Sequence, residues 1–114
     1  MKGNPVLLDK LNVLLASEFA AVAQYMAHEG KALNWGYGEL AAVLHEHLED
    51  ERKHAAALIS RILFLGGAPV VDKLDPPVAI GAAVDGMIAN DLRAETAAVT
   101  AYNTGIALAV SVGP

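Results

Sequence analysis

The sequence predicts an all-α fold: an antiparallel helical bundle with three long helices and a long crossover between the second and the third. Two observations support this prediction. Apolar residues recur every three or four positions in three long segments, which is the period of one face of an α-helix. No segment shows the alternation of apolar and polar residues that marks a half-buried strand. The length of 114 residues suits a single domain, which we place at residues 1–114.

The first helix is predicted at about residues 5–34. Asn4 can cap its amino end, and Pro5 suits the first helical position, where a missing N–H costs nothing. The helix is expected to end in the segment Asn34-Trp35-Gly36-Tyr37-Gly38. Its inward stripe is predicted to consist of Leu8, Leu11, Leu15, Glu18, Val22 and Tyr25.

The second helix is predicted at about residues 38–65. The run Gly66-Gly67-Ala68-Pro69 is a strong helix terminator and marks its end. The helix contains a Glu-x-x-His at Glu51 and His54. Its inward stripe is predicted to consist of Leu40, Leu44, His47, Glu51, His54, Leu58, Ile62 and Leu65.

The third helix is predicted at about residues 80–112, after a connection that contains Pro69, Pro76 and Pro77. This connection is too long for a tight turn between neighbouring helices, so it is expected to be a crossover. Gly86 and Gly105 weaken the helix without forbidding it. The inward stripe is predicted to consist of Val84, Ile88, Asp91, Glu95, Ala98, Tyr102, Ile106 and Ala109.

Composition excludes several classes of function. The net charge of −5 disfavours nucleic-acid binding, which needs a basic surface. The chain has no cysteine, which excludes disulfides, thiol catalysis, iron–sulfur clusters and cysteine zinc sites. The most apolar tract, residues 105–112, is too short to span a bilayer, and the amino terminus shows no cleavable signal. We therefore expect a cytoplasmic protein that binds neither nucleic acid nor membrane.

Four ionisable residues fall on these apolar stripes: Glu18 on the first helix, Glu51 and His54 on the second, and Glu95 on the third. A carboxylate in an apolar seam is costly unless it is protonated, paired or bound to a metal. Pairing among three glutamates is unfavourable because their charges repel, whereas a metal ion neutralises them and also uses the imidazole. Carboxylates with an imidazole and no thiolate suit iron or manganese. The spacing of Glu51 and His54 puts both on one helical face, so both can reach one dinuclear centre.

Other polar residues have plainer interpretations. A Glu-x-x-His taken alone usually lies on a solvated helix face. Tyr25 is expected to be a core aromatic whose hydroxyl has a partner, and His47 to be a partly buried neighbour rather than an additional ligand. We expect His28 and His45 at the surface. An ordinary solvated acidic face is expected for Glu46, Glu49 and Asp50.

The chain resembles the bacterioferritin family along nearly its whole length. In the first helix and the turn after it, the similar residues are Met1-Lys2-Gly3, Leu11-Asn12, Leu14-Leu15, Glu18, Gln24-Tyr25, His28, Asn34-Trp35-Gly36 and Leu40. In the second helix and its exit, they are Asp50-Glu51, Lys53-His54-Ala55, Arg61-Ile62-Leu63-Phe64-Leu65, Gly67 and Pro69. In the third, they are Asp91-Leu92 and Glu95.

The resemblance implies a ferritin-like bundle and a di-iron ferroxidase centre, with Glu18, Glu51, His54 and Glu95 in ligand positions. Glu51 and Glu95 resemble the two carboxylates that bridge the irons in that family. The resemblance also implies iron storage, with ferrous iron and dioxygen or peroxide as reactants. The resemblance further implies that the chain assembles into a homo-oligomer, which could be a hollow cage.

Two features depart from the family pattern. Arg52 stands where the family has the methionine that ligates haem, and a guanidinium cannot be an axial ligand, so we predict that no haem binds. The family's fourth helix carries a second Glu-x-x-His, whereas the sequence runs to Pro114 at the point where the third helix would lead into it. Three helices are therefore expected to leave an open apolar groove, which a partner covers or which truncation has exposed.

Two other functions remain open. The chain could be a non-catalytic shell or assembly subunit of a ferritin-like oligomer, without a competent centre. It could also be another dimetal-carboxylate enzyme, such as a manganese catalase or a peroxide reductase. Oxygen consumption on addition of ferrous iron separates ferroxidase from shell subunit. Fast disproportionation of peroxide without iron turnover would favour the catalase.

Overall fold

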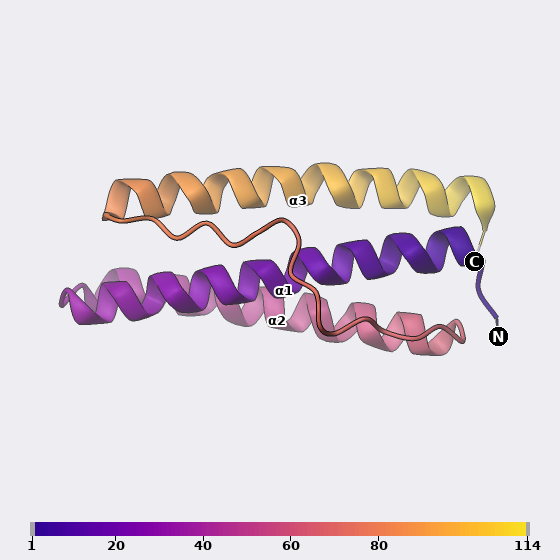
Figure 1. Cartoon of the computed structure of the whole chain (residues 1–114), viewed down its shortest axis with the longest axis horizontal. Coiled ribbons are helices and arrows are strands. Elements are labelled where there is room, and N and C mark those ends of the chain that lie inside the picture. The colour runs from indigo at the N-terminus through magenta and orange to yellow at the C-terminus, as the bar shows by residue number, and fades with distance from the viewer. Residues whose placement is uncertain (1, 114) are drawn as a thin grey trace.

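The structure is a computed structural model that describes residues 2–113. It contains three long helices, α1 (Pro5–Asn34), α2 (Gly38–Phe64) and α3 (Val84–Val112), as Figure 1 shows. The all-α prediction is confirmed. Asn4 caps α1 as expected, because its side-chain oxygen accepts from the Val6 N–H at 2.8 Å. Within the described range, none of the three helices combines the length and the hydropathy that crossing a bilayer requires.

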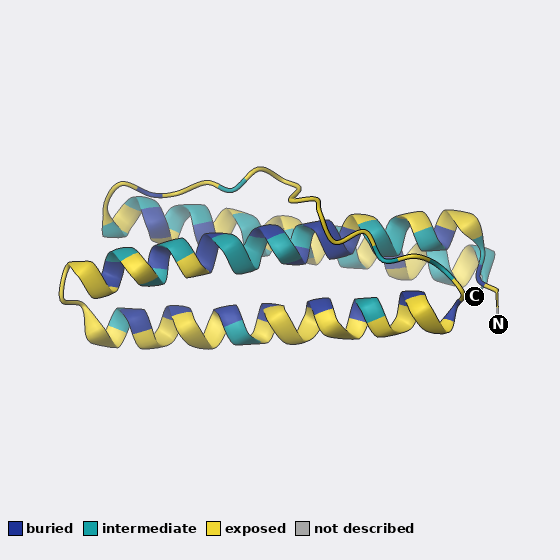
Figure 2. Ribbon diagram, turned by 60° about the horizontal axis from the view of Figure 1, so that its bottom comes forward, coloured by how far each residue is buried: buried dark blue, intermediate teal, exposed yellow. Residues whose placement is uncertain are grey.

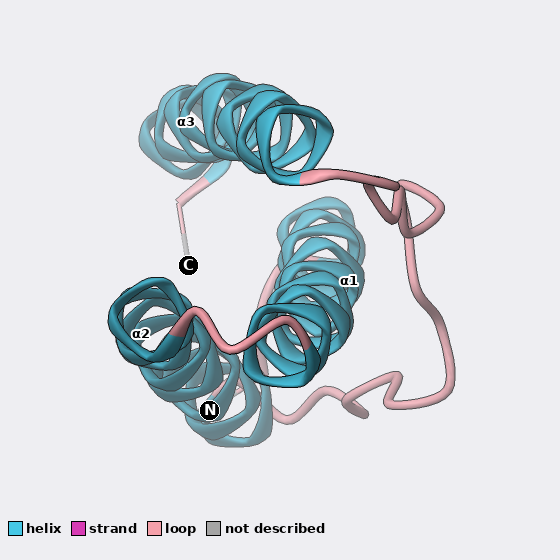
Figure 3. Ribbon diagram, turned by 90° about the vertical axis from the view of Figure 1, so that its left-hand side faces the viewer, coloured by secondary structure: helices cyan, strands magenta, loops and turns pink. Residues whose placement is uncertain are grey.

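Helix α1 is the centre of the bundle. A short turn at residues 35–37 reverses the chain, so α2 lies antiparallel to α1. The crossover at residues 65–83 then carries the chain back along the bundle, so α3 runs antiparallel to α1 and in the same direction as α2 (Figure 1). Both α2 and α3 pack against α1, from different sides, as the end-on view in Figure 3 shows.

The end of the crossover is tied to α1, and this sets where α3 begins. The Ala79 N–H donates to the Gln24 side-chain oxygen, and the Gly81 N–H donates to His28 Nε2, both at 3.0 Å. These bonds hold the chain extended up to Ala83, whose φ of −131° and ψ of 171° are not helical. Helix α3 therefore begins at residue 84, later than the predicted start at residue 80.

The apolar core is divided into two clusters along the bundle. One cluster consists of Tyr25, Ala32, Ala41, Leu44, Leu48 and Met87. The other consists of Leu14, Leu15, Ala55, Leu58 and Ile62. Figure 2 shows that the buried positions of α2 follow the edge that faces α1. The sequence positions of Glu18 and Glu51 fall between the two clusters, so the polar centre interrupts an otherwise apolar seam.

The predicted inward stripe of α3 is wrong at two positions. Ile88 is 54% exposed and Ile106 is 62% exposed, whereas Met87 and Gly105, one residue earlier in each case, are buried. Helix α3 packs on α1 through that neighbouring face, which leaves the isoleucines on its open side. Leu92, at 66% exposed, adds to the same uncovered apolar surface.

A groove runs between the helices on this open side, as expected for three helices. Its volume is about 460 Å³, and its wall includes Ile106. The other lining residues are Leu7, Lys10, Leu11, Leu14, Leu58, Arg61, Leu65, Tyr102, Gly105, Ala109 and Gly113.

Candidate metal centre

Three of the four predicted ligands come together at the middle of the bundle. Glu18, Glu51 and His54 each offer a ligand atom, and these atoms all lie within 4.8 Å of one another. His54 Nδ1 lies 3.4 Å from Glu51 Oε2 and 3.6 Å from Glu18 Oε2. Glu51 and His54 are close because residues three apart on a helix share a face. Glu18 meets them from the neighbouring helix α1.

The two carboxylates and the imidazole differ in burial. Glu18 is 2% exposed and Glu51 is 7% exposed. The side chain of His54, by contrast, is 56% exposed, although the sequence placed it on the inward stripe of α2. It reaches the carboxylates from the open side of the bundle, where it lines a shallow pocket with Leu58 and Tyr102. The two carboxylates are therefore buried, and the cluster is accessible from the side on which His54 lies.

Glu95 lies next to this cluster without being part of it. With Glu18 and Glu51 it lines a small internal cavity of about 20 Å³. That volume has room for about one water-sized species. The Glu95 carboxylate accepts a hydrogen bond from the Tyr25 hydroxyl at 2.6 Å. Three carboxylates from three helices thus surround one small space.

Burial, together with the neighbouring carboxylates, changes the protonation of Glu51. Burial, followed by its interactions with Glu18 and Glu95, raises the pKa of the Glu51 carboxyl to about 9. A carboxyl with such a pKa is protonated at neutral pH unless a cation stands beside it. A metal ion would supply that cation and would favour the ionised form.

Glu18 carries the clearest sign of a missing partner. Its Oε1 accepts from the Tyr102 hydroxyl at 2.7 Å, but its Oε2 is buried and has no hydrogen-bond partner among the described residues. Burying an acceptor without a partner is costly. A cation held by Glu18, Glu51 and His54 would satisfy this oxygen, and a carboxylate–imidazole set of this kind suits iron or manganese.

Two tyrosines hold the flanking carboxylates in place. The hydroxyl of Tyr25 donates to Glu95, and that of Tyr102 donates to Glu18. Burial, together with these hydrogen bonds, raises the pKa of both hydroxyls above their usual range. Both phenols are therefore donors at neutral pH. Tyr25 is buried with its hydroxyl satisfied, which confirms the prediction for it.

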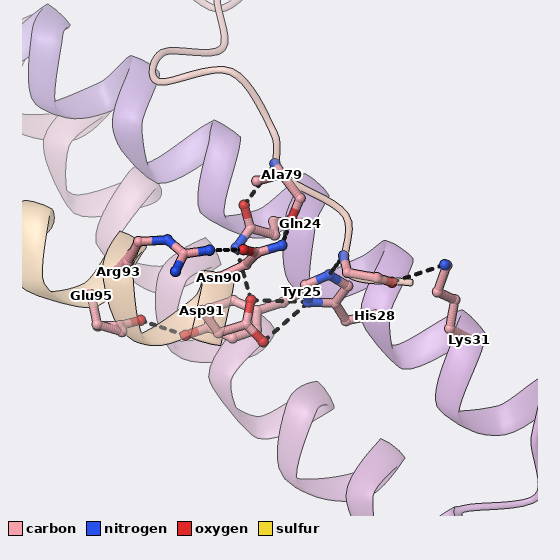
Figure 4. A network of polar contacts seen from close by, with 10 residues as sticks. Gln24, Tyr25, His28, Lys31, Ala79, Asn90, Asp91, Arg93 and Glu95 are labelled. Atoms are coloured by element: carbon pink, nitrogen blue, oxygen red, sulfur yellow. Dashed lines mark hydrogen bonds and ion pairs between the residues drawn. The ribbon is translucent and has the colours of Figure 1, made fainter. Parts of the chain in front are cut away.

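A second polar network lies next to the centre, and the sequence did not predict it. His28, predicted at the surface, is fully buried. Its Nδ1 lies 3.0 Å from Asp91 Oδ1 and its Nε2 accepts from the Gly81 N–H, so the ring joins α1, the crossover and α3 (Figure 4). Gln24 Nε2 donates to the same Asp91 oxygen at 2.8 Å. The surface prediction for His28 was wrong: the residue follows Tyr25 by three positions on the inward face of α1, and the crossover and α3 complete its burial.

The remaining histidines are exposed. His45 is exposed as predicted and pairs with Glu29 at 3.1 Å. His47, predicted to be partly buried, is exposed, and its ring stacks on that of Tyr25 with centroids 5.3 Å apart. The predicted acidic face also contains an ion pair, because Arg52 binds Glu49 at 2.8 Å.

Comparison with known proteins agrees with this architecture. The family model of the ferritin-like domain matches residues 8–113. The bacterial ferritin of Pseudomonas aeruginosa is 39% identical over 110 residues, which cover 95% of this chain and 69% of that protein. The bacterioferritin of Rhodobacter capsulatus is 35% identical over 113 residues, which cover 99% of this chain and 70% of that protein.

A solved structure of Rhodobacter capsulatus bacterioferritin superimposes with a TM-score of 0.95 at 35% identity. The match covers 99% of this chain and 70% of the other, and that structure is described as having a metal-free dinuclear site and a haem iron. The chain therefore belongs to the ferritin-like family and, within it, is a homologue of the bacterioferritins.

Proposed function

We propose that this chain takes part in iron storage by binding ferrous ions at Glu18, Glu51, His54 and Glu95 and promoting their oxidation. The proposal rests mainly on the buried Glu18 Oε2, which has no hydrogen-bond partner among the described residues and lies beside the potential ligand groups of Glu51 and His54. Family membership supports iron as the metal.

The residues would act mainly through charge and position. The carboxylates of Glu18, Glu51 and Glu95 favour the higher charge of the ferric product over that of ferrous iron. Oxidation of two ferrous ions releases two electrons, which reduce dioxygen to hydrogen peroxide or hydrogen peroxide to water. The exposed edge of His54 marks the side from which iron would arrive. One chain offers three carboxylates and one imidazole, so a complete dinuclear centre would need ligands from outside residues 2–113.

The test is oxygen consumption after ferrous iron is added to the metal-free protein. We expect uptake well above that of ferrous iron in buffer alone, and loss of the excess in Glu18→Ala. No excess uptake would contradict ferroxidase activity and favour a shell subunit. Rapid disproportionation of peroxide by the manganese-loaded protein, without iron turnover, would favour the catalase alternative.

Haem binding should be absent at the position where the family ligates it. Arg52 is exposed and pairs with Glu49. Its guanidinium stays protonated and therefore has no lone pair to offer an iron. Incubation with haem followed by gel filtration should leave no stoichiometric complex. Replacing Arg52 by methionine tests whether this residue prevents haem binding. If two chains pair to form the site, the variant should bind haem and show an absorption spectrum of the bis-methionine type. A haem complex of the unaltered chain that depends on residue 52 would contradict this.

The chain should also assemble into an oligomer. Ile88, Leu92, Val99 and Ile106 each leave more than half of their surface exposed on α3, and a continuous apolar face of this kind normally has a partner. Light scattering at micromolar concentration should give a mass above that of one chain. A Leu92→Glu, Ile106→Glu double variant should shift the mass towards the monomer. A well-folded monomer of the unaltered chain would rule out this assembly.

A further inference from the structure

Two hydrogen bonds join α1 and α3 in a reciprocal pattern. On α1, Tyr25 follows Glu18 by about two helical turns, and on α3, Tyr102 follows Glu95 by the same spacing. The helices are antiparallel, so each tyrosine comes opposite the glutamate of the other helix. Tyr25 reaches Glu95 Oε1 at 2.6 Å, and Tyr102 reaches Glu18 Oε1 at 2.7 Å.

The surroundings of the two tyrosines differ. Tyr25 is 3% exposed and belongs to the apolar core, so its ring has an evident packing role. Tyr102 is only half-buried and lines the open pocket together with His54. Its hydroxyl nevertheless points inward, to a carboxylate that is almost completely buried. Packing alone does not require a hydroxyl at this position.

The hydroxyl of Tyr102 distinguishes the two oxygens of Glu18. It occupies Oε1, which leaves Oε2 as the oxygen without a partner, 3.6 Å from His54 Nδ1. Rotation of the carboxylate would break the bond to Tyr102 and would move Oε2 away from His54. A phenylalanine would fill the same space and leave Glu18 free to rotate.

We propose that Tyr102 is a positioning residue of the metal centre, which holds Glu18 through Oε1 and directs Oε2, as the ligand oxygen, towards Glu51 and His54. The inference rests on the proposed function, because it concerns the same ligands. Hydrogen bonds to ligating groups fix their orientation, and removing one typically lowers metal affinity by about 10- to 100-fold.

The test compares Co²⁺ binding to the metal-free unaltered chain, to Tyr102→Phe and to the matched control Tyr37→Phe. Tyr37 is exposed in the turn between α1 and α2, away from the centre. Visible absorption of Co²⁺ reports the number and geometry of its ligands as well as the affinity. We expect Tyr102→Phe to bind Co²⁺ at least about tenfold more weakly and with an altered visible spectrum. Tyr37→Phe should match the unaltered chain in both.

A second replacement keeps the test decisive if the phenylalanine variant folds poorly. Incorporating 3-fluorotyrosine at position 102 retains the hydroxyl donor, so affinity and spectrum should match those of the unaltered chain. Weakened binding in this variant would contradict the proposal. So would a Tyr102→Phe variant that melts at a lower temperature but binds Co²⁺ with the original affinity and spectrum, since that outcome describes a purely structural role.

The unaltered chain separates this inference from the proposed function. If it binds no Co²⁺, or binds it equally well after Glu51→Ala, the centre itself is misplaced and both proposals fall. If Glu51→Ala abolishes binding while Tyr102→Phe leaves it unchanged, only the role of Tyr102 is overturned.

Discussion

Replacing Glu51 by glutamine should remove most binding of Zn²⁺ or ferrous iron and should, at the same time, stabilise the metal-free protein. The carboxylate lies between the other acidic ligands, so its loss removes the group most able to contact a metal held there. Titration calorimetry at neutral pH measures the first effect. We expect affinity to fall by at least about 100-fold, because a ligand contributes at least as much as the residues that orient it.

The gain in stability follows from the pKa of Glu51. Because folding raises this pKa from 4.5 to about 9, the protonated carboxyl is the form that the fold prefers. Its contribution to stability is complete below the unfolded pKa and is lost as pH rises towards 9. The metal-free chain should therefore lose stability between about pH 5 and pH 9. The glutamine variant should lose much less, and by pH 8 should melt on the order of 5 °C above the unaltered chain.

The matched control is Glu46→Gln, an exposed acid on the same helix. It should change neither Zn²⁺ affinity nor the pH dependence of stability. Unchanged Zn²⁺ stoichiometry and affinity in the Glu51 variant would remove this residue from the metal centre. An unchanged melting temperature at pH 8 would show that its carboxyl is not held protonated by its neighbours.

Replacing Asp91 by alanine should lower the free energy of unfolding of the metal-free protein more than the loss of any other polar side chain. Its carboxylate receives the Gln24 amide at 2.8 Å and the His28 ring at 3.0 Å, and His28 is completely buried. Asp91→Ala leaves both groups without their partner. Leaving a buried polar group without its partner costs about 1–3 kcal/mol in the free energy of unfolding for each group.

Urea denaturation of the metal-free chain measures this cost. Asp85→Ala serves as the control, because Asp85 is an exposed acid in the first turn of the same helix, where its effect should stay below about 1 kcal/mol. Asp91→Asn keeps the shape and one acceptor, so its loss should fall between the two. Equal midpoints for the two alanine variants would show that the network around His28 contributes little.

The helical pattern was sufficient to predict the carboxylates of the centre but not the surroundings that hold them. Glu18 and Glu51 were recognised because each interrupts an apolar stripe, and His54 because it follows Glu51 by one turn. These are local relationships within one helix. They do not say how far a side chain is covered by its neighbours, so the exposure of His54 was not predicted.

The misjudged positions depend on contacts between segments far apart in sequence. His28 was assigned to the surface although it follows Tyr25 by three residues and so continues the inward stripe of α1. Its partners, Gly81 and Asp91, lie on the crossover and on α3, so they could not be predicted from the first helix. The stripe of α3 was misplaced at Ile88 because the apolar residues of that helix extend beyond the single face that packs on α1. The hydroxyl of Tyr102 could have been noticed from the equal spacing of the two Glu–Tyr pairs, but the direction of its bond needs the antiparallel packing.

Anomalous diffraction from crystals of the protein grown with Zn²⁺ or ferrous iron tests the proposed metal centre most directly. Data collected on both sides of the absorption edge locate the metal without reference to its ligands. We expect a strong peak within bonding distance of Glu18 Oε2, Glu51 and His54, on the side of the pocket that Tyr102 lines. A fully occupied peak elsewhere, with Glu18 Oε2 still lacking a partner, would contradict the proposed centre.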